Sequence, residues 1–403
     1  MGISIVLTAC FLSGCGVRFK ASLWDELTAN NSSIATMGFA STATLPTSSG
    51  PLSITLSDLD GDGKLDVVTA DAISNQLSIR RNTSSVSAIG FAASSTLATG
   101  TNPFSVFTAD LDGDLLPDLL SADISSDQVS IRRNTSSIGS ISFAALQAFG
   151  AAGGGPVFAI ASDLDGDGLA DLIRGDFSAN AIRVRRNTSS VGSISFAAQQ
   201  NAGAIGSPFN GVTGDIDGDG RLDIVAATCG NTVVIRNTST LGSISFAALN
   251  NFVSTCGLPS VFVSDLDGDG KLDVISYDAN TGALSTRLNT STVGSISLAA
   301  ASSFTAGAGP TASGFGFAPN GVYAKDMNLD GKPDVLVSDS AGNQIAIYIN
   351  QSTIGNISLS TTPVLVSTGS GTVGVVAEDL NGDSLPDVVS VNYTANDVTT
   401  VKN

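Results

Sequence analysis

The sequence predicts an all-β protein made of seven similar units, and three observations lead to this prediction. A nine-residue acidic motif, DLDGDGKLD in its first copy at 58–66, returns in six further copies that begin at Asp110, Asp163, Asp215, Asp265, Asp326 and Asp379. Successive copies begin between 50 and 61 residues apart, a spacing typical of propeller blades. The residues between the copies divide into short apolar runs separated by turn residues, with no sustained helical periodicity. We therefore expect a seven-bladed β-propeller with four antiparallel strands in each blade.

The first unit shows how one blade is read from the sequence. Leu52, Ile54 and Leu56 alternate with polar residues, which predicts a first strand with one buried side. The acidic motif follows as a loop, and apolar runs at 65–70 and 77–80 predict the second and third strands. After a polar turn at 82–85, the segment 89–91 predicts the fourth strand.

The last blade needs a strand from elsewhere in the chain. Copies of the fourth-strand segment follow the first six acidic motifs, but the seventh is followed by two strand candidates that end at Asn403. The missing copy resembles the segment 31–40, which matches 82–92. We therefore expect residues 37–40 to pair with the blade formed by 373–403, so that the ring closes and no strand edge stays free.

Each acidic motif has the ligand spacing of a hard-cation site. Carboxylates stand at positions 1, 3, 5 and 9, position 7 offers a backbone carbonyl, and glycine at position 6 of most copies allows the bend. Oxygen ligands without His or Cys favour calcium over zinc or copper. The alternative is a set of solvated acidic turns without an ion, but four carboxylates so close together would repel one another strongly. We expect about seven Ca²⁺ sites.

The same pattern selects the ligands in every copy. In the sixth and seventh copies an asparagine replaces the second aspartate, and its amide oxygen can still bind a cation. The selected residues are Asp58, Asp60, Asp62, Lys64 and Asp66; Asp110, Asp112, Asp114, Leu116 and Asp118; Asp163, Asp165, Asp167, Leu169 and Asp171; Asp215, Asp217, Asp219, Arg221 and Asp223; Asp265, Asp267, Asp269, Lys271 and Asp273; Asp326, Asn328, Asp330, Lys332 and Asp334; and Asp379, Asn381, Asp383, Leu385 and Asp387.

Charge and composition narrow the classes of function. The 403-residue chain has a net charge of −18, and the seven motifs hold 26 of its 36 acidic residues. The acidity is therefore mainly a property of the motifs, and the absence of a basic patch argues against nucleic-acid binding. The sequence contains no histidine, which removes the commonest general base, so we expect a protein that is not an enzyme.

The amino-terminal residues read as an export signal. Residues 3–12 are nearly all apolar, the run is too short to span a bilayer comfortably, and the LSGC at 12–15 resembles the lipobox of bacterial lipoproteins. By that resemblance Cys15 is lipidated, residues 1–15 are the signal segment, 16–30 a tether and 31–403 the propeller. We expect the chain to be exported and lipid-anchored to a bacterial membrane, at the outer membrane or the cell surface, with simple secretion as the alternative.

The cysteines and arginines suggest further contacts. After export Cys229 and Cys256 remain, and the strand order puts both on the face opposite the acidic motifs, so we expect a disulfide between them. Arginine pairs recur where the third strand ends, for example Arg80 and Arg81. We expect them to pair with carboxylates of neighbouring blades, while a ring of cations for an anionic ligand is the alternative. The Asn-Thr-Ser triplets match glycosylation acceptors but are more simply hairpin turns.

The acidic motif inside a repeat of this length resembles the FG-GAP/VCBS family, the calcium-dependent propellers known from the integrin α-subunit head. The resemblance covers 31–403, although the Phe-Gly and Gly-Ala-Pro elements are only loosely present, as at 149–150 and 153–156. It implies calcium in the loop between the first and second strands of each blade, on one face of a disc. It also implies that ligands meet the opposite face.

The expected function is binding to another molecule at the cell surface. We expect a calcium-stabilised, lipid-anchored module for adhesion or protein–protein interaction, whose ligand is a surface protein or a glycan. A carbohydrate-binding, lectin-like propeller is the alternative, although one Trp and four Tyr offer few aromatic platforms. A calcium-dependent polysaccharide-active enzyme is third. The longest repeat has its extra residues at 305–320, where Phe315 and Phe317 are the candidate ligand contacts.

Overall fold

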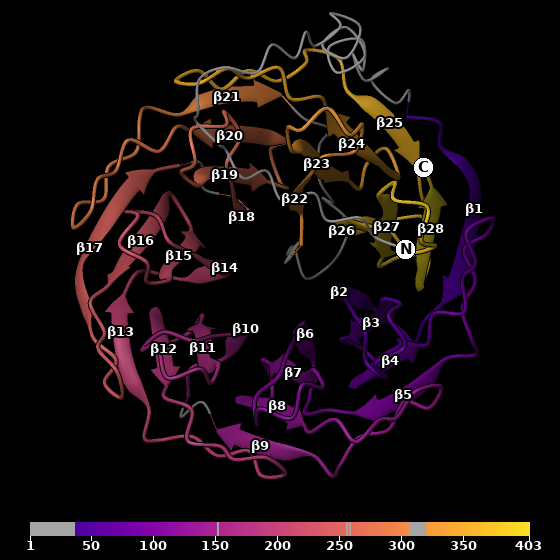
Figure 1. The fold of residues 1–403 in the computed structure, drawn as a ribbon, viewed down its shortest axis with the longest axis horizontal. Helices are drawn as coiled ribbons and strands as arrows, with labels where there is room; N and C mark the ends of the chain where they lie inside the picture. Colours follow the sequence, from indigo (N-terminus) through magenta and orange to yellow (C-terminus); the bar gives the residue numbers. More distant parts are fainter. Residues whose placement is uncertain (1–36, 151–152, 255–256, 258, 306–319) are drawn as a thin grey trace, which may run out of the picture.

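The fold is a disc of seven blades around a central axis (Figure 1). The computed structural model describes residues 37–150, 153–254, 257, 259–305 and 320–403. These residues form 28 strands and no helix. Because every sheet has four antiparallel strands, the predicted all-β, seven-bladed propeller is confirmed.

Six blades are built from strands that follow one another in the sequence. From the axis outwards, blade 1 contains β2 (Pro51–Ser57), β3 (Asp66–Asp71), β4 (Gln76–Arg80) and β5 (Ser95–Ala98), and blade 2 contains β6 (Pro103–Ala109), β7 (Asp118–Asp123), β8 (Gln128–Arg132) and β9 (Gln147–Gly150). Blade 3 contains β10 (Pro156–Ser162), β11 (Asp171–Asp176), β12 (Ala181–Arg185) and β13 (Gln200–Ala204), and blade 4 contains β14 (Pro208–Gly214), β15 (Asp223–Thr228), β16 (Asn231–Asn237) and β17 (Phe246–Val253). Blade 5 contains β18 (Pro259–Ser264), β19 (Asp273–Asp278), β20 (Ala283–Arg287) and β21 (Ser302–Thr305), and blade 6 contains β22 (Val322–Lys325), β23 (Asp334–Asp339), β24 (Gln344–Tyr348) and β25 (Val364–Ser367).

The seventh blade joins the two ends of the described chain. Its strands are β26 (Thr372–Glu378), β27 (Asp387–Asn392), β28 (Asp397–Lys402) and, on the outside, β1 (Ala40–Pro46). β1 pairs antiparallel with β28 from Ala40 opposite Lys402 to Pro46 opposite Asp397. The predicted closure of the ring by the amino-terminal strand is confirmed, but the pairing strand lies a few residues later than 37–40.

In five of the other six blades the fourth strand also lies later than predicted, whereas β17 of blade 4 begins at Phe246, within the segment equivalent to 89–91. The segment 89–91 forms no continuous strand: Asn82 bridges Phe91 and Ser85 bridges Ala88, and β5 begins at Ser95. The prediction was wrong here because the Ile-x-Phe pattern reflects packing and not strand pairing. Ile89 and Phe91 are half-buried and pack on the core cluster between blades 7 and 1.

The core lies between neighbouring blades. The second strand of blade 1, β3, is buried along its whole length, and a cluster that includes Leu59, Val68 and Ile79 of this blade packs against Val106 and Leu119 of blade 2. Each blade therefore buries its apolar side on the next, which is the usual logic of radial repeats.

Two faces of the disc are distinguished by their connections. The connections from the first to the second strand and from the third to the fourth strand lie on one face, which we call the acidic-loop face. The turns from the second to the third strand and the connections between blades lie on the other, which we call the opposite face.

Candidate metal centre

The acidic loops are folded around their first aspartate. In blade 1, Asp58 Oδ1 accepts hydrogen bonds from the backbone N–H groups of Gly61 at 2.9 Å and Asp62 at 3.1 Å, and its Oδ2 accepts one from Gly63 at 2.8 Å. Gly61 and Gly63 have φ values of 75° and 84°, a left-handed conformation that glycine adopts without strain. The motif's glycines are therefore required by the turn that brings the carboxylates together.

The last aspartate of each loop is buried and holds the backbone on both sides. Asp66 Oδ2 accepts from Leu59 N–H at 2.9 Å, and Asp66 Oδ1 accepts from Asn82 N–H at 2.7 Å. Burial raises the pKa of Asp66 to about 6 despite these hydrogen bonds, and repulsion from Asp60 and Asp62 adds to the rise. The same combination raises the pKa of Asp118 to about 7.

Five loops gather carboxylates closely enough to hold a metal ion. In each of blades 1 to 5, three carboxylates offer one oxygen apiece within 4.8 Å of one another. These groups are Asp58, Asp60 and Asp62; Asp110, Asp112 and Asp118; Asp163, Asp165 and Asp171; Asp215, Asp217 and Asp223; and Asp265, Asp267 and Asp269. The groups agree with the predicted ligand pattern, because positions 1 and 3 contribute in every one and position 5 or 9 completes it.

Two buried oxygens show that these groups fit a cation. Asp112 Oδ1 and Asp165 Oδ2 are buried, and neither has a hydrogen-bond partner within the described residues. A buried carboxylate oxygen without a donor is costly unless a cation compensates it. The donor set contains oxygen only, which suits a hard cation such as calcium.

The sixth and seventh loops differ through their asparagines. Asn328 Nδ2 donates to Asp330 Oδ2 at 3.2 Å, and Asn381 Nδ2 donates to Asp383 Oδ2 at 3.1 Å. Because the amide satisfies the neighbouring carboxylate, these loops carry less repulsion for a cation to relieve. We expect their affinity for a cation to be lower than that of the other five loops.

The arginine pairs do not act as one unit. The second member pairs with the acidic loop of its own blade, with Arg81 Nη1 at 3.3 Å from Asp62 Oδ2 and Arg186 Nη1 at 3.2 Å from Asp167 Oδ2. The first member instead reaches the preceding blade through a carbonyl, as when Arg132 Nη2 donates to Ala98 O at 2.8 Å. The expected pairing between blades is therefore wrong for the carboxylates, which are paired within a blade.

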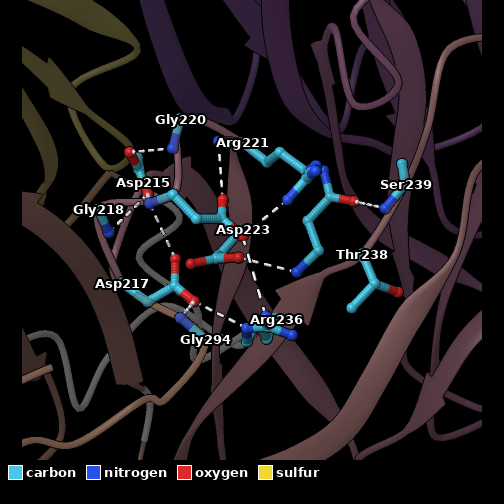
Figure 2. A network of polar contacts seen from close by, with 12 residues as sticks. Asp215, Asp217, Gly218, Gly220, Arg221, Asp223, Arg236, Thr238, Ser239 and Gly294 are labelled. Carbon is cyan, nitrogen blue, oxygen red and sulfur yellow. Dashed lines mark hydrogen bonds and ion pairs between the residues drawn. The ribbon is translucent and has the colours of Figure 1, made fainter. Parts of the chain in front are cut away.

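Blade 4 shows the complete arrangement around one loop (Figure 2). Asp215 accepts from the N–H groups of Gly218 and Gly220, both at 2.8 Å. Asp217 lies between Arg236, whose Nε donates at 2.7 Å, and Gly294 of the next blade, whose N–H donates at 2.9 Å. Gly139, Gly192 and Gly355 make the corresponding bond to Asp60, Asp112 and Asp267. In these four blades the second aspartate thus connects its loop to the neighbouring blade.

A buried asparagine ties every acidic loop to the next blade. The side-chain amide of Asn187 donates to Ala170 O in its own blade and to Leu111 O in the preceding one, both at 2.8 Å, and its Oδ1 accepts from Ser189 N–H at 2.9 Å. The bond to the preceding blade recurs seven times and closes the ring, made by Asn82, Asn134, Asn187, Asn237, Asn289, Asn350 and Asn403.

The asparagine ring was missed from the sequence, although its signal is visible there. Asn82, Asn134, Asn187 and Asn237 are fully buried, so these members of the Asn-Thr-Ser triplets are structural and not accessible acceptors. The signal was their fixed place immediately after the third strand in seven units. The predicted hairpin turns are confirmed, since Ser137 and Ser140 exchange two backbone hydrogen bonds in the turn that follows Asn134.

A central channel follows the axis between the innermost strands. Its cavity of about 590 Å³ is lined by residues of all seven innermost strands. At the acidic-loop end, Glu378 pairs with Lys325 at 2.7 Å and accepts from the Tyr323 hydroxyl at 3.1 Å. At the other end, Asn320 accepts from the Ser53 hydroxyl at 2.8 Å. The channel is therefore apolar along much of its wall, with paired polar groups at both ends.

The opposite face carries a second set of buried carboxylates, one at the end of the second strand in five blades. Asp71 accepts from the hydroxyls of Ser78 at 2.5 Å and Thr69 at 2.8 Å and from Ser48 N–H at 3.2 Å. Burial raises its pKa to about 6. Asp123, Asp176, Asp278 and Asp339 occupy the same place in four other blades, whereas blades 4 and 7 have Thr228 and Asn392.

Aromatic residues on the opposite face serve packing between blades. Phe104 is 1% exposed and belongs to the core. Phe177 and Phe209 are half-buried and meet edge to face, with ring centroids 5.4 Å apart. Cys229 is exposed in the turn between β15 and β16 and is disulfide-bonded. Its expected partner Cys256 lies outside the described residues, as do Cys15, Phe315 and Phe317. In the described part of the chain we find no helix with the length and hydropathy of a membrane span.

Comparison with known proteins agrees with the repeat structure. A model of the FG-GAP-like repeat matches residues 58–121, 110–174, 163–226, 215–276 and 326–390. Each match includes two successive acidic loops, so the five matches include all seven. Among curated proteins no match is found.

Several solved structures share the fold at low sequence identity. An Agrocybe aegerita lectin that recognises non-reducing terminal N-acetylglucosamine has a TM-score of 0.56 and 17% identity, covering 89% of this chain and 86% of the lectin. A putative 6-phosphogluconolactonase from Bacteroides fragilis has a TM-score of 0.54 and 13% identity over 79% and 85% of the two chains. BBS1N, solved in complex with ARL6DN, has a TM-score of 0.53 and 13% identity over 90% and 95%. At these identities the likeness concerns the fold alone. From the matched repeats and the seven blades together, the chain belongs to the FG-GAP-like repeat family.

Proposed function

We propose that this protein is a calcium-stabilised binding module, in which cations in the acidic loops hold the disc rigid and the opposite face meets a protein or glycan ligand. The observation that carries the proposal is the pair of buried carboxylate oxygens without donors, Asp112 Oδ1 and Asp165 Oδ2. They lie in loops that are bonded to the neighbouring blade through Asn187 and Asn237. A cation in these loops would therefore stabilise contacts between blades.

Removal of calcium should lower the melting temperature more than any single substitution. A site at calcium 100-fold above its Kd adds about 2.7 kcal/mol to the folded state, and at least five loops would contribute. We expect EGTA to lower the melting temperature by more than about 10 °C, as measured by calorimetry. Magnesium added in place of calcium is the control and should restore little, because it dehydrates reluctantly and demands octahedral geometry. An unchanged melting temperature in EGTA would refute the calcium part of the proposal.

The variation of the opposite face supports a ligand surface there. The acidic loops repeat the same bonds from blade to blade, whereas the connections on the opposite face differ in length and sequence. Variable loops on a rigid scaffold commonly carry binding. The central cavity has Asn210, Asn320 and Phe158 among its lining residues, and Asn320 lies at the end that faces these connections.

Glycan-array and surface-protein pulldown screens, run with and without calcium, test the ligand. We expect the double change Phe315→Ala and Phe317→Ala to weaken binding at an unchanged melting temperature. Phe252→Ala, on the outer strand β17, is the matched control and should leave binding intact. If only the melting temperature falls, these phenylalanines pack the fold and the opposite face loses its support as the ligand surface.

A lectin-like function is the second candidate, and a shared fold with the Agrocybe aegerita lectin favours it. A sugar that binds in the array and competes in solution would select this candidate over a protein ligand. A polysaccharide-active enzyme remains the third, tested by assaying soluble products from polysaccharide substrates.

A lipid anchor at Cys15 completes the proposal. The lipobox-like LSGC at 12–15 supports it, and the module would then be displayed on a bacterial membrane. Mass spectrometry of protein extracted from bacterial membranes tests it, because lipidation adds acyl chains to Cys15 that the variant Cys15→Ser lacks.

A further inference from the structure

An exposed aliphatic side chain recurs at one place in six blades. It stands at the tip of the hairpin that follows the third strand, and we call these residues the aliphatic tips: Val86, Ile138, Val191, Leu241, Val293 and Ile354. They are between 63% and 78% exposed. Single exposed apolar residues are ordinary, but six at equivalent positions form a ring that calls for an explanation.

The same hydrogen bonds fix each tip on the acidic-loop face. Ser137 and Ser140 exchange backbone bonds at 3.0 and 2.7 Å around the turn that contains Ile138. The next residue, Gly139, has a φ of 84° and donates its N–H to Asp60 Oδ2 of the preceding blade at 2.9 Å. Each such tip therefore lies beside the acidic loop of the preceding blade, and equivalent bonds repeat at Gly192, Gly294 and Gly355.

Leu115, on the same face, combines a strained backbone conformation with an exposed side chain. Leu115 occupies position 6 of the second acidic loop, where Gly63, Gly168 and Gly220 stand in other loops. It has a φ of 70° and is 88% exposed. A leucine in the left-handed region costs energy that glycine avoids, and at this exposure it gains almost no packing within the fold. Within the described residues this apolar side chain has little to pack against.

The chain joins the disc at this face. Asn403 N–H donates to Asp387 Oδ1 in the seventh acidic loop at 3.0 Å, and Gly38 N–H donates to Asn403 Oδ1 at 3.3 Å. The start of β1 therefore lies on the acidic-loop face. Cys15 precedes β1 in the sequence, so the proposed lipid anchor would join the disc at the acidic-loop face.

We propose that the acidic-loop face is a membrane-docking surface, whose aliphatic tips and Leu115 insert into the interfacial layer of a phospholipid bilayer. A bilayer is a flat partner that can meet the whole ring at once, so that weak insertions act together. The acidic loops oppose docking to anionic headgroups until cations reduce their charge. The charge part rests on the proposed calcium sites, whereas insertion of the tips does not.

Vesicle flotation with the unlipidated chain from residue 16 onward tests the proposal. With millimolar calcium, we expect the chain to bind vesicles of phosphatidylethanolamine and phosphatidylglycerol, and the triple variant Ile138→Ser, Val191→Ser, Leu241→Ser to bind them at least about tenfold more weakly. Its melting temperature should be unchanged, because these side chains are exposed. Leu115→Gly should weaken binding while keeping or raising the melting temperature.

The controls separate docking from the calcium proposal and from other partners. Val253→Ser removes an aliphatic residue that is 76% exposed on an outer strand, and it should leave vesicle binding unchanged. Phosphatidylcholine vesicles without calcium isolate insertion: a loss there in the triple variant supports the tips even if the loops hold no calcium. Equal binding of the wild type and triple variant to both kinds of vesicle overturns the proposal. A dimer that sedimentation detects without lipid in the wild type, but not in the triple variant, also overturns the proposal. The aliphatic tips would then contact a second copy of the chain.

Discussion

The two faces of the disc fasten their blades in different ways. On the acidic-loop face, the same asparagine amide crosses to the preceding blade seven times. On the opposite face, the equivalent place at the end of the second strand has an aspartate in five blades, Thr228 in blade 4 and Asn392 in blade 7. The surrounding partners differ as well, since Asp71 is held by hydroxyls but Asp176 by Arg174 and Arg183.

This difference shows which contacts are the same in every blade and which contacts vary from blade to blade. A loop that gathers carboxylates has few conformations that avoid strain and repulsion, so its bonds recur. A single buried carboxylate needs only some donors, and hydroxyl, guanidinium or backbone N–H groups all serve. The opposite face therefore has room for individual connections, whereas the acidic-loop face has little.

Among the substitutions that compare the two faces, the largest expected effect comes from the covalent connection on the opposite face. If Cys229 and Cys256 are bridged, the double change to alanine should lower the free energy of unfolding by about 3–4 kcal/mol, because the bridge closes a loop of roughly 27 residues. Alkylation of the native, unreduced protein followed by mass spectrometry measures the thiols. Modification of both cysteines would show that blade 4 keeps its connections without a bridge.

The next largest effect is expected from the asparagine ring on the acidic-loop face. Asn187→Ala should lower the free energy of unfolding by about 2–3 kcal/mol, since two buried carbonyls and one N–H lose their partners. Urea unfolding measures it. Asn201→Ala, at an exposed position of β13, is the matched control and should change stability by less than about 0.5 kcal/mol. If the two variants are equally stable, the ring does not fasten the blades.

The smallest effect concerns the buried carboxylates of the opposite face, and Asp71 in particular, through their dependence on pH. Burial raises the pKa of Asp71 to about 6 from its ordinary value of 3.8, so its protonated form favours folding. This contribution is fully present below about pH 4 and is lost as pH rises through 6. Asp71→Asn stays neutral and should be more stable than the wild type by about 1–2 kcal/mol at pH 7, but not at pH 4.

Blade 7 already has an asparagine, Asn392, at the position equivalent to Asp71. Asn392 donates from Nδ2 to the Thr399 hydroxyl at 2.8 Å and accepts from the Ser390 hydroxyl at 3.2 Å. Ser78 and Thr69 can play the same parts for an asparagine at position 71. Equal stability differences at both pH values would mean that folding does not raise the pKa of Asp71.

The sequence predicted the blade count, the acidic loops and the closing strand because each repeats within a short, regular spacing. It did not predict the asparagine ring, since the carbonyl that Asn134 reaches in the preceding blade belongs to Leu59, 75 residues away. It misplaced the fourth strand because two apolar residues separated by one position, Ile89 and Phe91, fit a strand and also fit a loop that packs on the core between blades. The aliphatic tips were not predicted either, because the sequence of a turn does not show whether its apolar residue is exposed.

The pairing of β1 with β28 has a consequence for the order in which the protein folds. Six blades use strands that are neighbours in the sequence, so each can assemble from a newly made segment soon after it emerges. The seventh unites residues 40–46 with 397–402, and its outer strand is synthesised first but finds its partner last. Long-range pairing of this kind is slow, because the closure entropy of the whole chain opposes it. Until that step, β28 presents an open edge to other chains, so the interval before closure is when this protein is most exposed to aggregation.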